Sequence, residues 1–182
     1  HMPSECSSVM HSVLEHGGSL TIVANGGEVV RPHANFRVVA TANTGGFGDD
    51  SGLHPAAQVQ DAAMRSRFDA VYHVDYMGGD HEAQVLVNVA GIGADHAKRI
   101  VAFAHDTRTA TRSGDLSHAV SIRETIAWSR MATRHADNGE PALAYGLAVA
   151  VLGKVPATDA TAMAEMAQRH FGDLFGDPAK AD

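Results

Sequence analysis

The sequence predicts an α/β segment followed by a segment that is entirely helical. Residues 19–31 hold two short strand-like stretches around an Asn-Gly-Gly turn, which is a strong hairpin signal. Two apolar runs of strand length follow, FRVVATA at 36–42 and AVYHVDY at 70–76. Beyond Gly79, apolar side chains recur every three or four residues, the spacing that gives a helix one apolar face. These three observations define the predicted fold class.

The α/β segment is expected to begin with a short amphipathic helix. Residues 4–16 have a serine suited to the N-cap, apolar residues on one face, and Gly17-Gly18 as a stop signal. The hairpin strands are predicted at 19–24 and 28–31, joined by Asn25-Gly26-Gly27, because Asn and Gly tolerate the positive φ angles of a tight turn.

The two apolar runs are predicted as core strands. The run at 36–42 is almost continuously apolar, as expected for a strand that is buried on both faces of a sheet. The run at 70–76 is predicted as the second strand. Between them, four glycines within 44–53 predict an extended loop, and residues 58–66 predict a helix.

Five helices are expected beyond Gly79. Asp80 is predicted to cap the first and Asp159 the fifth, and the other three are predicted to begin at or next to Ala94, Ser121 and Pro141. Ser121 and Glu124 have the spacing of a capping box, in which each side chain can bond the backbone of the other residue. The second helix is expected to run to about Ala110, and the fourth to end at Gly153. The fifth is expected to bury one face, formed by Met163, Met166, His170, Phe171 and Leu174.

The predicted domain boundary follows the second apolar run. Residues 3–77 form the α/β part, residues 78–175 the helical domain, and residues 176–182 a disordered tail. The opening His1-Met2 is typical of a cloning remnant, so we expect the chain to begin within a longer gene.

Composition excludes several classes of protein. The 182-residue chain has a net charge of −7 and no basic tract, so nucleic-acid binding is not expected. It has no run of about 18 apolar residues, so no membrane span is predicted. A single cysteine, Cys6, cannot form an intramolecular disulfide, which favours a cytoplasmic location. The twelve histidines show no His-x-x-x-His spacing and Cys6 has no partner cysteine, so no metal site is predicted.

Motifs for phosphate binding and covalent catalysis are missing from the sequence. The nearest approach to a P-loop is GLAVAVLGKV at 146–155, which has the wrong glycine spacing and Val155 in place of the required hydroxyl. There is no GxGxxG fingerprint, no strand that ends in the Asp-Glu pair of a magnesium site, and no Ser-His-Asp or Cys-His arrangement. Alone, this chain is not expected to bind or hydrolyse ATP in the P-loop manner.

Three stretches nevertheless carry a family resemblance. FRVVATANT, GGFGDDSGL and AAMRSRFD, in that order, are similar to the AAA+ ATPases of the MoxR-like branch. Within that branch they look closest to the ATPase subunit of cobaltochelatase and its relatives (the AAA_5 type), which pair with von Willebrand factor A proteins. TRSGDLSHAVSIRETIAW at 111–128 resembles the lid motif of the branch. The resemblance extends from about Pro3 to Phe175.

The resemblance implies roles for three polar residues. Asn43, at the tip of the first predicted core strand, matches the first sensor, whose carboxamide can bond both the attacking water and the γ-phosphate. Arg67 matches the arginine finger, which neutralises charge on a neighbouring subunit's nucleotide, with Arg65 as the reserve candidate. Arg123 matches the second sensor, although Ile122 stands where the family usually has proline.

Each of these residues also has a simpler interpretation. A strand-end asparagine such as Asn43 can merely close a turn, and Arg67 can be a solvated surface charge. Arg123 shares a helix face with Arg130 and Arg134, so the three can form a plain basic stripe.

The resemblance also implies an architecture with a missing front half. Residues 3–77 correspond to the rear part of a P-loop core, without the P-loop and the Walker B strand, and residues 78–175 to an all-helical lid. In that fold the P-loop strand lies between the two core strands predicted here. We therefore expect both strands to be left with unpaired edges, and the sheet to be rearranged or to pair with another chain.

The function implied is that of a ring-forming, homo-oligomeric ATPase. Such a motor couples ATP hydrolysis to chaperone-like remodelling of a partner protein or to metal insertion, with ATP and Mg²⁺ in the full-length parent and none held tightly by this fragment. A von Willebrand factor A protein is the implied partner. The alternative is a non-catalytic oligomerisation or interaction module that lacks nucleotide binding. The sequence does not choose between cobaltochelatase and a general chaperone of the branch.

Overall fold

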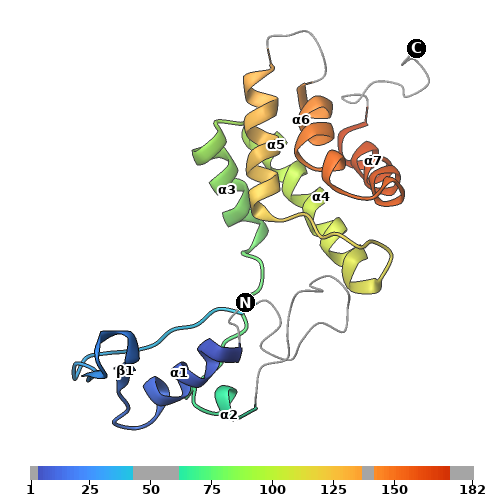
Figure 1. Cartoon of the computed structure of the whole chain (residues 1–182). Helices are drawn as coiled ribbons and strands as arrows, with labels where there is room; N and C mark the ends of the chain where they lie inside the picture. Colours follow the sequence, from blue (N-terminus) through green and yellow to red (C-terminus); the bar gives the residue numbers. More distant parts are fainter. Residues whose placement is uncertain (1–3, 43–61, 137–141, 173–182) are drawn as a thin grey trace. The chain divides into compact units, whose positions relative to one another are not determined.

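The computed structural model describes residues 4–42, 62–136 and 142–172. The chain divides into two compact units, unit 1 over His1–Val74 and unit 2 over Asp75–Asp182. Figure 1 shows both units, coloured along the sequence. Asn43, the glycine-rich stretch 44–53 and the tail lie outside the described residues, so the predictions made for them stay predictions.

Unit 1 contains the predicted hairpin. Strands β1 (Leu20–Ile22) and β2 (Glu28–Val30) pair antiparallel, with Leu20 opposite Val30. A short 3₁₀ turn, η1 (Val23–Asn25), joins them, and it is followed by Gly26 at φ 69° and Gly27 at φ 83°. Residues with a side chain rarely adopt such positive φ angles, which explains why glycines occupy both positions. The hairpin prediction is confirmed.

Two helices flank the hairpin in the chain. Helix α1 (Ser4–Leu14) ends where the Gly18 N–H donates to the Glu15 carbonyl at 2.8 Å, in agreement with the predicted glycine stop. Helix α2 (Ala62–Arg65) is the described part of the helix predicted over 58–66. Its Met64 is buried.

The two predicted core strands are not formed. Residues 36–42 and 70–76 have no regular secondary structure, and β1–β2 is the one sheet among the described residues. Val39 is 90% exposed and Val74 is 94% exposed. A strand is stable only when its N–H and C=O groups bond a neighbouring strand, and the described parts of the chain offer none to these runs. The prediction of a hairpin plus two core strands is thus wrong in its second half.

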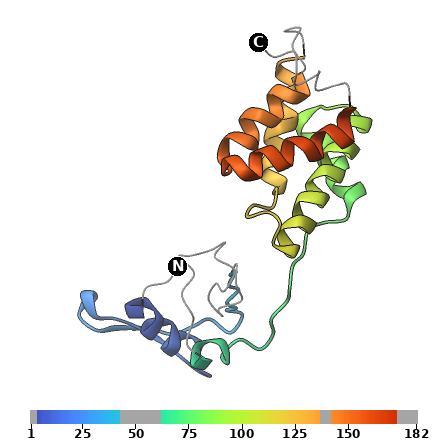
Figure 2. The ribbon, with the colours of Figure 1, turned by 90° about the vertical axis from the view of Figure 1, so that its right-hand side faces the viewer.

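Unit 2 is all-helical, as predicted. Its helices are α3 (Gly79–Ala90), α4 (Ala94–Ser113), α5 (Ile122–Arg134), α6 (Ala142–Ala150) and α7 (Ala157–Phe171), with the 3₁₀ turn η2 (Leu152–Lys154) between the last two. Helix α5 packs against α3 and against α6, as Figure 1 shows. Helix α7 packs against α4, which can be followed in Figure 2.

Trp128 on α5 is the centre of the core of unit 2. Its ring meets Phe103 edge to face at 5.3 Å between centroids and Phe171 at 5.4 Å. Its indole N–H donates to the Leu143 carbonyl at 2.8 Å, so no buried polar group of this side chain is left unpaired. On α6, Gly146 lies so close that a Cβ there would be 2.6 Å from the Trp128 ring. The α5–α6 contact therefore explains a glycine in the middle of a helix.

Two predicted helix caps are wrong. Helix α3 has Gly78 at its N-cap, and Asp80 lies in the first turn. Helix α7 has Pro156 at its N-cap, and Asp159 instead accepts hydrogen bonds from the backbone N–H and the hydroxyl of Ser117 at 2.9 and 2.7 Å. Proline already fixes a φ compatible with a helix start, which leaves the Asp159 carboxylate for a long-range contact that spacing alone does not indicate.

Among the described helices, none is long and apolar enough to cross a membrane.

Candidate functional site

The N-terminus of helix α5 is the best-defined polar site of unit 2. Ser121 is the N-cap, with extended backbone angles. Its N–H and its hydroxyl both donate to Oε2 of Glu124 at 2.8 Å, as predicted from the capping-box spacing. The start of α5 is therefore fixed at Ser121, and with it the backbone position of each residue in the first turn.

Arg123 is the second residue of this helix and is exposed. Its guanidinium makes no hydrogen bond or ion pair with any residue that the structure describes. A helix N-terminus attracts anions through its free N–H groups and its dipole. Here the Glu124 carboxylate already satisfies part of that potential, so anion binding at this end depends on the Arg123 side chain.

The charge of Glu124 is stabilised by its surroundings. Burial raises the pKa of Glu124, but the hydrogen bonds from the Ser121 N–H and hydroxyl and the nearby His118 outweigh burial, so the net pKa lies below its usual value. His118 Nε2 is 2.8 Å from Oε1 of Glu124. The carboxylate that caps α5 is thus ionised at neutral pH.

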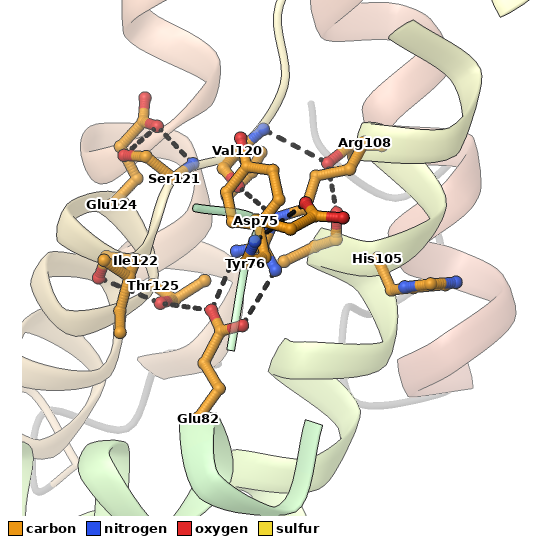
Figure 3. Close-up of polar contacts among 12 residues, drawn as sticks. Asp75, Tyr76, Glu82, His105, Arg108, Val120, Ser121, Ile122, Glu124 and Thr125 are labelled. Atoms are coloured by element: carbon orange, nitrogen blue, oxygen red, sulfur yellow. Dashed lines mark hydrogen bonds and ion pairs between the residues drawn. The ribbon is translucent and has the colours of Figure 1, made fainter. Parts of the chain in front are cut away.

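A buried ion pair lies next to Val120, the residue before the N-cap of α5 (Figure 3). Arg108 on α4 bonds Glu82 on α3 through both terminal nitrogens, each at 2.8 Å, and its Nε donates to the Val120 carbonyl at 2.8 Å. The two side chains are 5% and 1% exposed. This two-point geometry is the strongest form of arginine–carboxylate contact.

Two threonines and one tyrosine complete this network. The Val120 N–H donates to the Thr107 hydroxyl at 3.3 Å, and the Thr125 hydroxyl donates to Glu82 at 3.4 Å. The Tyr76 ring stacks on the Arg108 guanidinium, 3.8 Å from its carbon to the ring centroid. We name Tyr76, Glu82, Thr107, Arg108, Val120 and Thr125 the Arg108 network.

Sequence reasoning missed the Arg108 network, although a signal was present. Glu82 precedes Ala83 and Leu86 on the apolar face of α3, and Arg108 follows Ala104 by one helical turn on the apolar face of α4. Opposite charges on the apolar faces of consecutive helices indicate a buried pair, because an isolated buried charge is very unfavourable.

The arginine-finger candidates lie in unit 1. Arg67 lies two residues beyond the end of α2, and its Nε is 3.0 Å from the Glu15 carboxylate. A second nitrogen also contacts Glu15, and a third contacts the Ala63 carbonyl. Arg65 is the last residue of α2 and is partly buried. Arg67 and Arg123 belong to different units, so neither unit contains a site built from both.

No group of three or more His, Cys, Asp or Glu side chains in the described ranges is arranged to hold a metal ion.

Comparison with known proteins identifies the family. A family model described as CbbQ/NirQ/NorQ C-terminal matches residues 82–170, which contain both Arg108 and Arg123. The chain is also 35% identical over 169 residues to the aerobic cobaltochelatase subunit CobS of Sinorhizobium sp, a match that covers 90% of this chain. These two matches support the identification of the chain as the C-terminal portion of a MoxR-like AAA+ ATPase. The chain spans 49% of the length of that relative, and the resemblance seen in the sequence motifs is confirmed.

Proposed function

We propose that this chain is the sensor and lid portion of a ring-forming AAA+ ATPase. The observation that carries the proposal is Arg123, an exposed cation fixed on the capped start of α5, within the segment that matches the family model. An arginine in this setting can contact the γ-phosphate of ATP held by its own subunit. It lies on the lid, so the contact links nucleotide state to lid position.

Arg67 is the proposed charge for a neighbouring subunit's nucleotide, with Arg65 in reserve. In the present structure Arg67 pairs with Glu15, whose side chain is 56% exposed. An ion pair of this kind contributes at most about 1 kcal/mol, so a phosphate can replace the carboxylate. Asn43 is the proposed first sensor, which orients the attacking water.

ATP and Mg²⁺ are the proposed cofactors of the whole ATPase. We assign the P-loop and the Asp-Glu strand, which these 182 residues lack, to another part of the ATPase, and we do not expect these residues to turn over ATP alone. Mg²⁺ neutralises charge on the phosphates as the γ-phosphoryl group leaves. The residues described here contribute differently: Arg123 orients the phosphate, and Arg67 stabilises charge across the subunit interface.

The proposed work of the motor is remodelling of a partner protein or metal insertion. The relative is an aerobic cobaltochelatase subunit, which favours metal insertion. A homo-oligomeric ring and a partner with a von Willebrand factor A domain belong to the same proposal.

A second candidate is a non-catalytic oligomerisation or interaction module. The missing P-loop sequence supports it, and so does unit 2, which has a complete core of its own. In this case Asn43, Arg67 and Arg123 have no role in hydrolysis.

The test starts with the gene sequence upstream of the Pro3 codon. If it encodes a P-loop and an Asp-Glu strand, the encoded protein is purified and its ATP binding and turnover are measured. Arg123→Ala should lower kcat about 10²–10³-fold, the usual effect of removing one charge-stabilising donor. Arg67→Ala should lower kcat about 10³–10⁵-fold and leave ATP binding intact.

Arg130→Ala is the matched control, because Arg130 is exposed on the same helix; it should turn over ATP like the wild type. Equal losses at Arg123 and Arg130 would refute the sensor and favour a basic stripe. A gene that starts at the Met2 codon would favour the second candidate.

A further inference from the structure

Arg108 joins three segments of unit 2 through a single side chain. It bonds Glu82 on α3, the Val120 carbonyl just before α5, and the ring of Tyr76 in the chain that enters the unit (Figure 3). Each of its nitrogens is held by a carboxylate or carbonyl at 2.8 Å. A guanidinium fixed this way has one orientation, so anything that moves it also moves its partners.

Val120 transmits this constraint to the start of α5. Its carbonyl accepts from Arg108, and its N–H donates to the Thr107 hydroxyl, which lies one residue before Arg108 on α4. Val120 is itself fully buried and directly precedes the N-cap Ser121. The backbone N–H and C=O of Val120 are therefore both bonded to side chains of α4, and Arg123 follows three residues later.

The Tyr76 ring stacks on the face of the Arg108 guanidinium. Tyr76 is the second residue of unit 2, and its neighbour Asp75 pairs with Arg112 on α4 at 3.1 Å. Tyr76 is 44% exposed, so its ring is not a core side chain. What distinguishes it is the aromatic face against a charge that is itself almost fully buried, the setting in which cation–π contacts are strongest.

We propose that Arg108 is a positioning residue for Arg123, and that Tyr76 couples the chain entering unit 2 to that position. A displacement of the chain at Tyr76 changes the position of the Arg108 guanidinium. Because Arg108 bonds the Val120 carbonyl, the start of α5 then moves as well. The consequence for nucleotide sensing rests on the proposed function. The coupling within unit 2 does not depend on it.

The first experiment measures amide hydrogen exchange in the 182-residue chain. Tyr76→Leu keeps apolar bulk but removes the aromatic face, and it leaves the buried ion pair intact. We expect exchange of the Val120, Ser121 and Glu124 amides to become about 3- to 30-fold faster, the range set by the strength of a cation–π contact. Tyr76→Phe, which keeps the face, should restore wild-type exchange.

Tyr145→Leu is the matched control, since it removes a partly exposed tyrosine from α6, away from the Arg108 network. It should leave those three amides unchanged. Equal effects of Tyr76→Leu and Tyr76→Phe would overturn the proposal. Acceleration spread evenly over all helices of unit 2 would overturn it too, because that pattern means general destabilisation.

The second experiment is a double-mutant cycle on ATP turnover in the longer protein. Tyr76→Leu should lower kcat several-fold when Arg123 is present and have no effect in the Arg123→Ala background. An equal loss in both backgrounds would overturn the coupling to Arg123. If the exchange pattern appears but the longer protein turns over no ATP, the proposed function fails while the positioning role of Arg108 stands.

Discussion

The two units of this chain differ in how far their apolar side chains are buried and in how their backbone N–H and C=O groups are paired. Unit 2 buries Trp128, Phe103, Ile100 and Leu86 completely, in a core to which all five of its described helices contribute. Among residues 9–42 and 62–74 of unit 1, Met64 is the one buried hydrophobic side chain. Yet the two runs that were predicted as core strands also carry large apolar side chains, and Val39 and Val74 among them are 90% and 94% exposed.

The difference shows what a strand-like run without a neighbouring strand lacks. A helix pairs its own N–H and C=O groups, so a helical segment needs from its neighbours only an apolar surface. A strand needs at least one neighbouring strand to bond its backbone, and the runs at 36–42 and 70–76 have none in the described chain. In a MoxR-like protein, helical portions can therefore keep their fold where sheet portions cannot.

The largest effect is expected from breaking the buried ion pair of unit 2. Glu82→Ala leaves the Arg108 charge buried without its carboxylate, which should lower the free energy of unfolding of unit 2 by about 3–5 kcal/mol. Urea unfolding followed by far-ultraviolet circular dichroism measures it. Glu165→Ala, an exposed carboxylate on α7, is the control and should change little. A loss below about 1 kcal/mol at Glu82 would mean that the pair is hydrated in solution.

Overpacking the α5–α6 contact should have the next largest effect. An added methyl in Gly146→Ala would lie 2.6 Å from the Trp128 ring and 2.9 Å from its carbonyl oxygen. The helices must shift to admit it, at an expected cost of about 1–3 kcal/mol. Gly79→Ala is the control, because its nearest neighbour, the Val101 methyl group, is 3.6 Å away. Calorimetry should show a lower Tm for the first variant only.

The cap of α5 should give a smaller effect that depends on pH. The folded-state pKa of Glu124 lies below its usual value, so its contribution is complete above the unfolded-state pKa of about 4.3. It is lost as pH falls through the lower folded-state pKa. Glu124→Gln should cost about 1 kcal/mol at neutral pH. It should also flatten the acid limb of the stability curve of unit 2, and an unchanged limb would contradict the assigned pKa direction.

The smallest effect is expected in unit 1. Arg67→Ala removes an ion pair with a mostly exposed carboxylate, and should change local stability by less than about 1 kcal/mol. Amide exchange of the β1–β2 hairpin measures it. Unfolding of unit 2 should not change at all. A loss of stability in both units would show that they unfold together. The two units would then differ only in how far their apolar side chains are exposed.

Local patterns predicted the local structure. The hairpin followed from Asn25-Gly26-Gly27, and the start of α5 from Ser121 and Glu124, because in both cases the residues that decide the structure are within a few positions of each other. The strands at 36–42 and 70–76 were not predictable in the same way. Their pattern is correct for a strand, but partners elsewhere decide whether one forms.

The site shows the same division. The setting of Arg123 on a capped helix start was predicted, whereas its support by Arg108 was not, since Arg108 and Glu82 are 26 positions apart. The contact between Asp159 and Ser117, 42 positions apart, was missed for the same reason, and a helix cap was predicted instead. The sequence indicates such tertiary hydrogen bonds only weakly, through a charged residue on a helix face that is otherwise apolar.

The burial of Trp128 has an optical consequence. It is the only tryptophan in the 182 residues, it is fully buried, and its indole is bonded to the Leu143 carbonyl. Its emission should therefore be shifted to shorter wavelength in the folded protein and move to longer wavelength when α5 and α6 separate. Because unit 1 has no tryptophan, this fluorescence reports on the helices of unit 2 alone in the 182-residue chain, without any label.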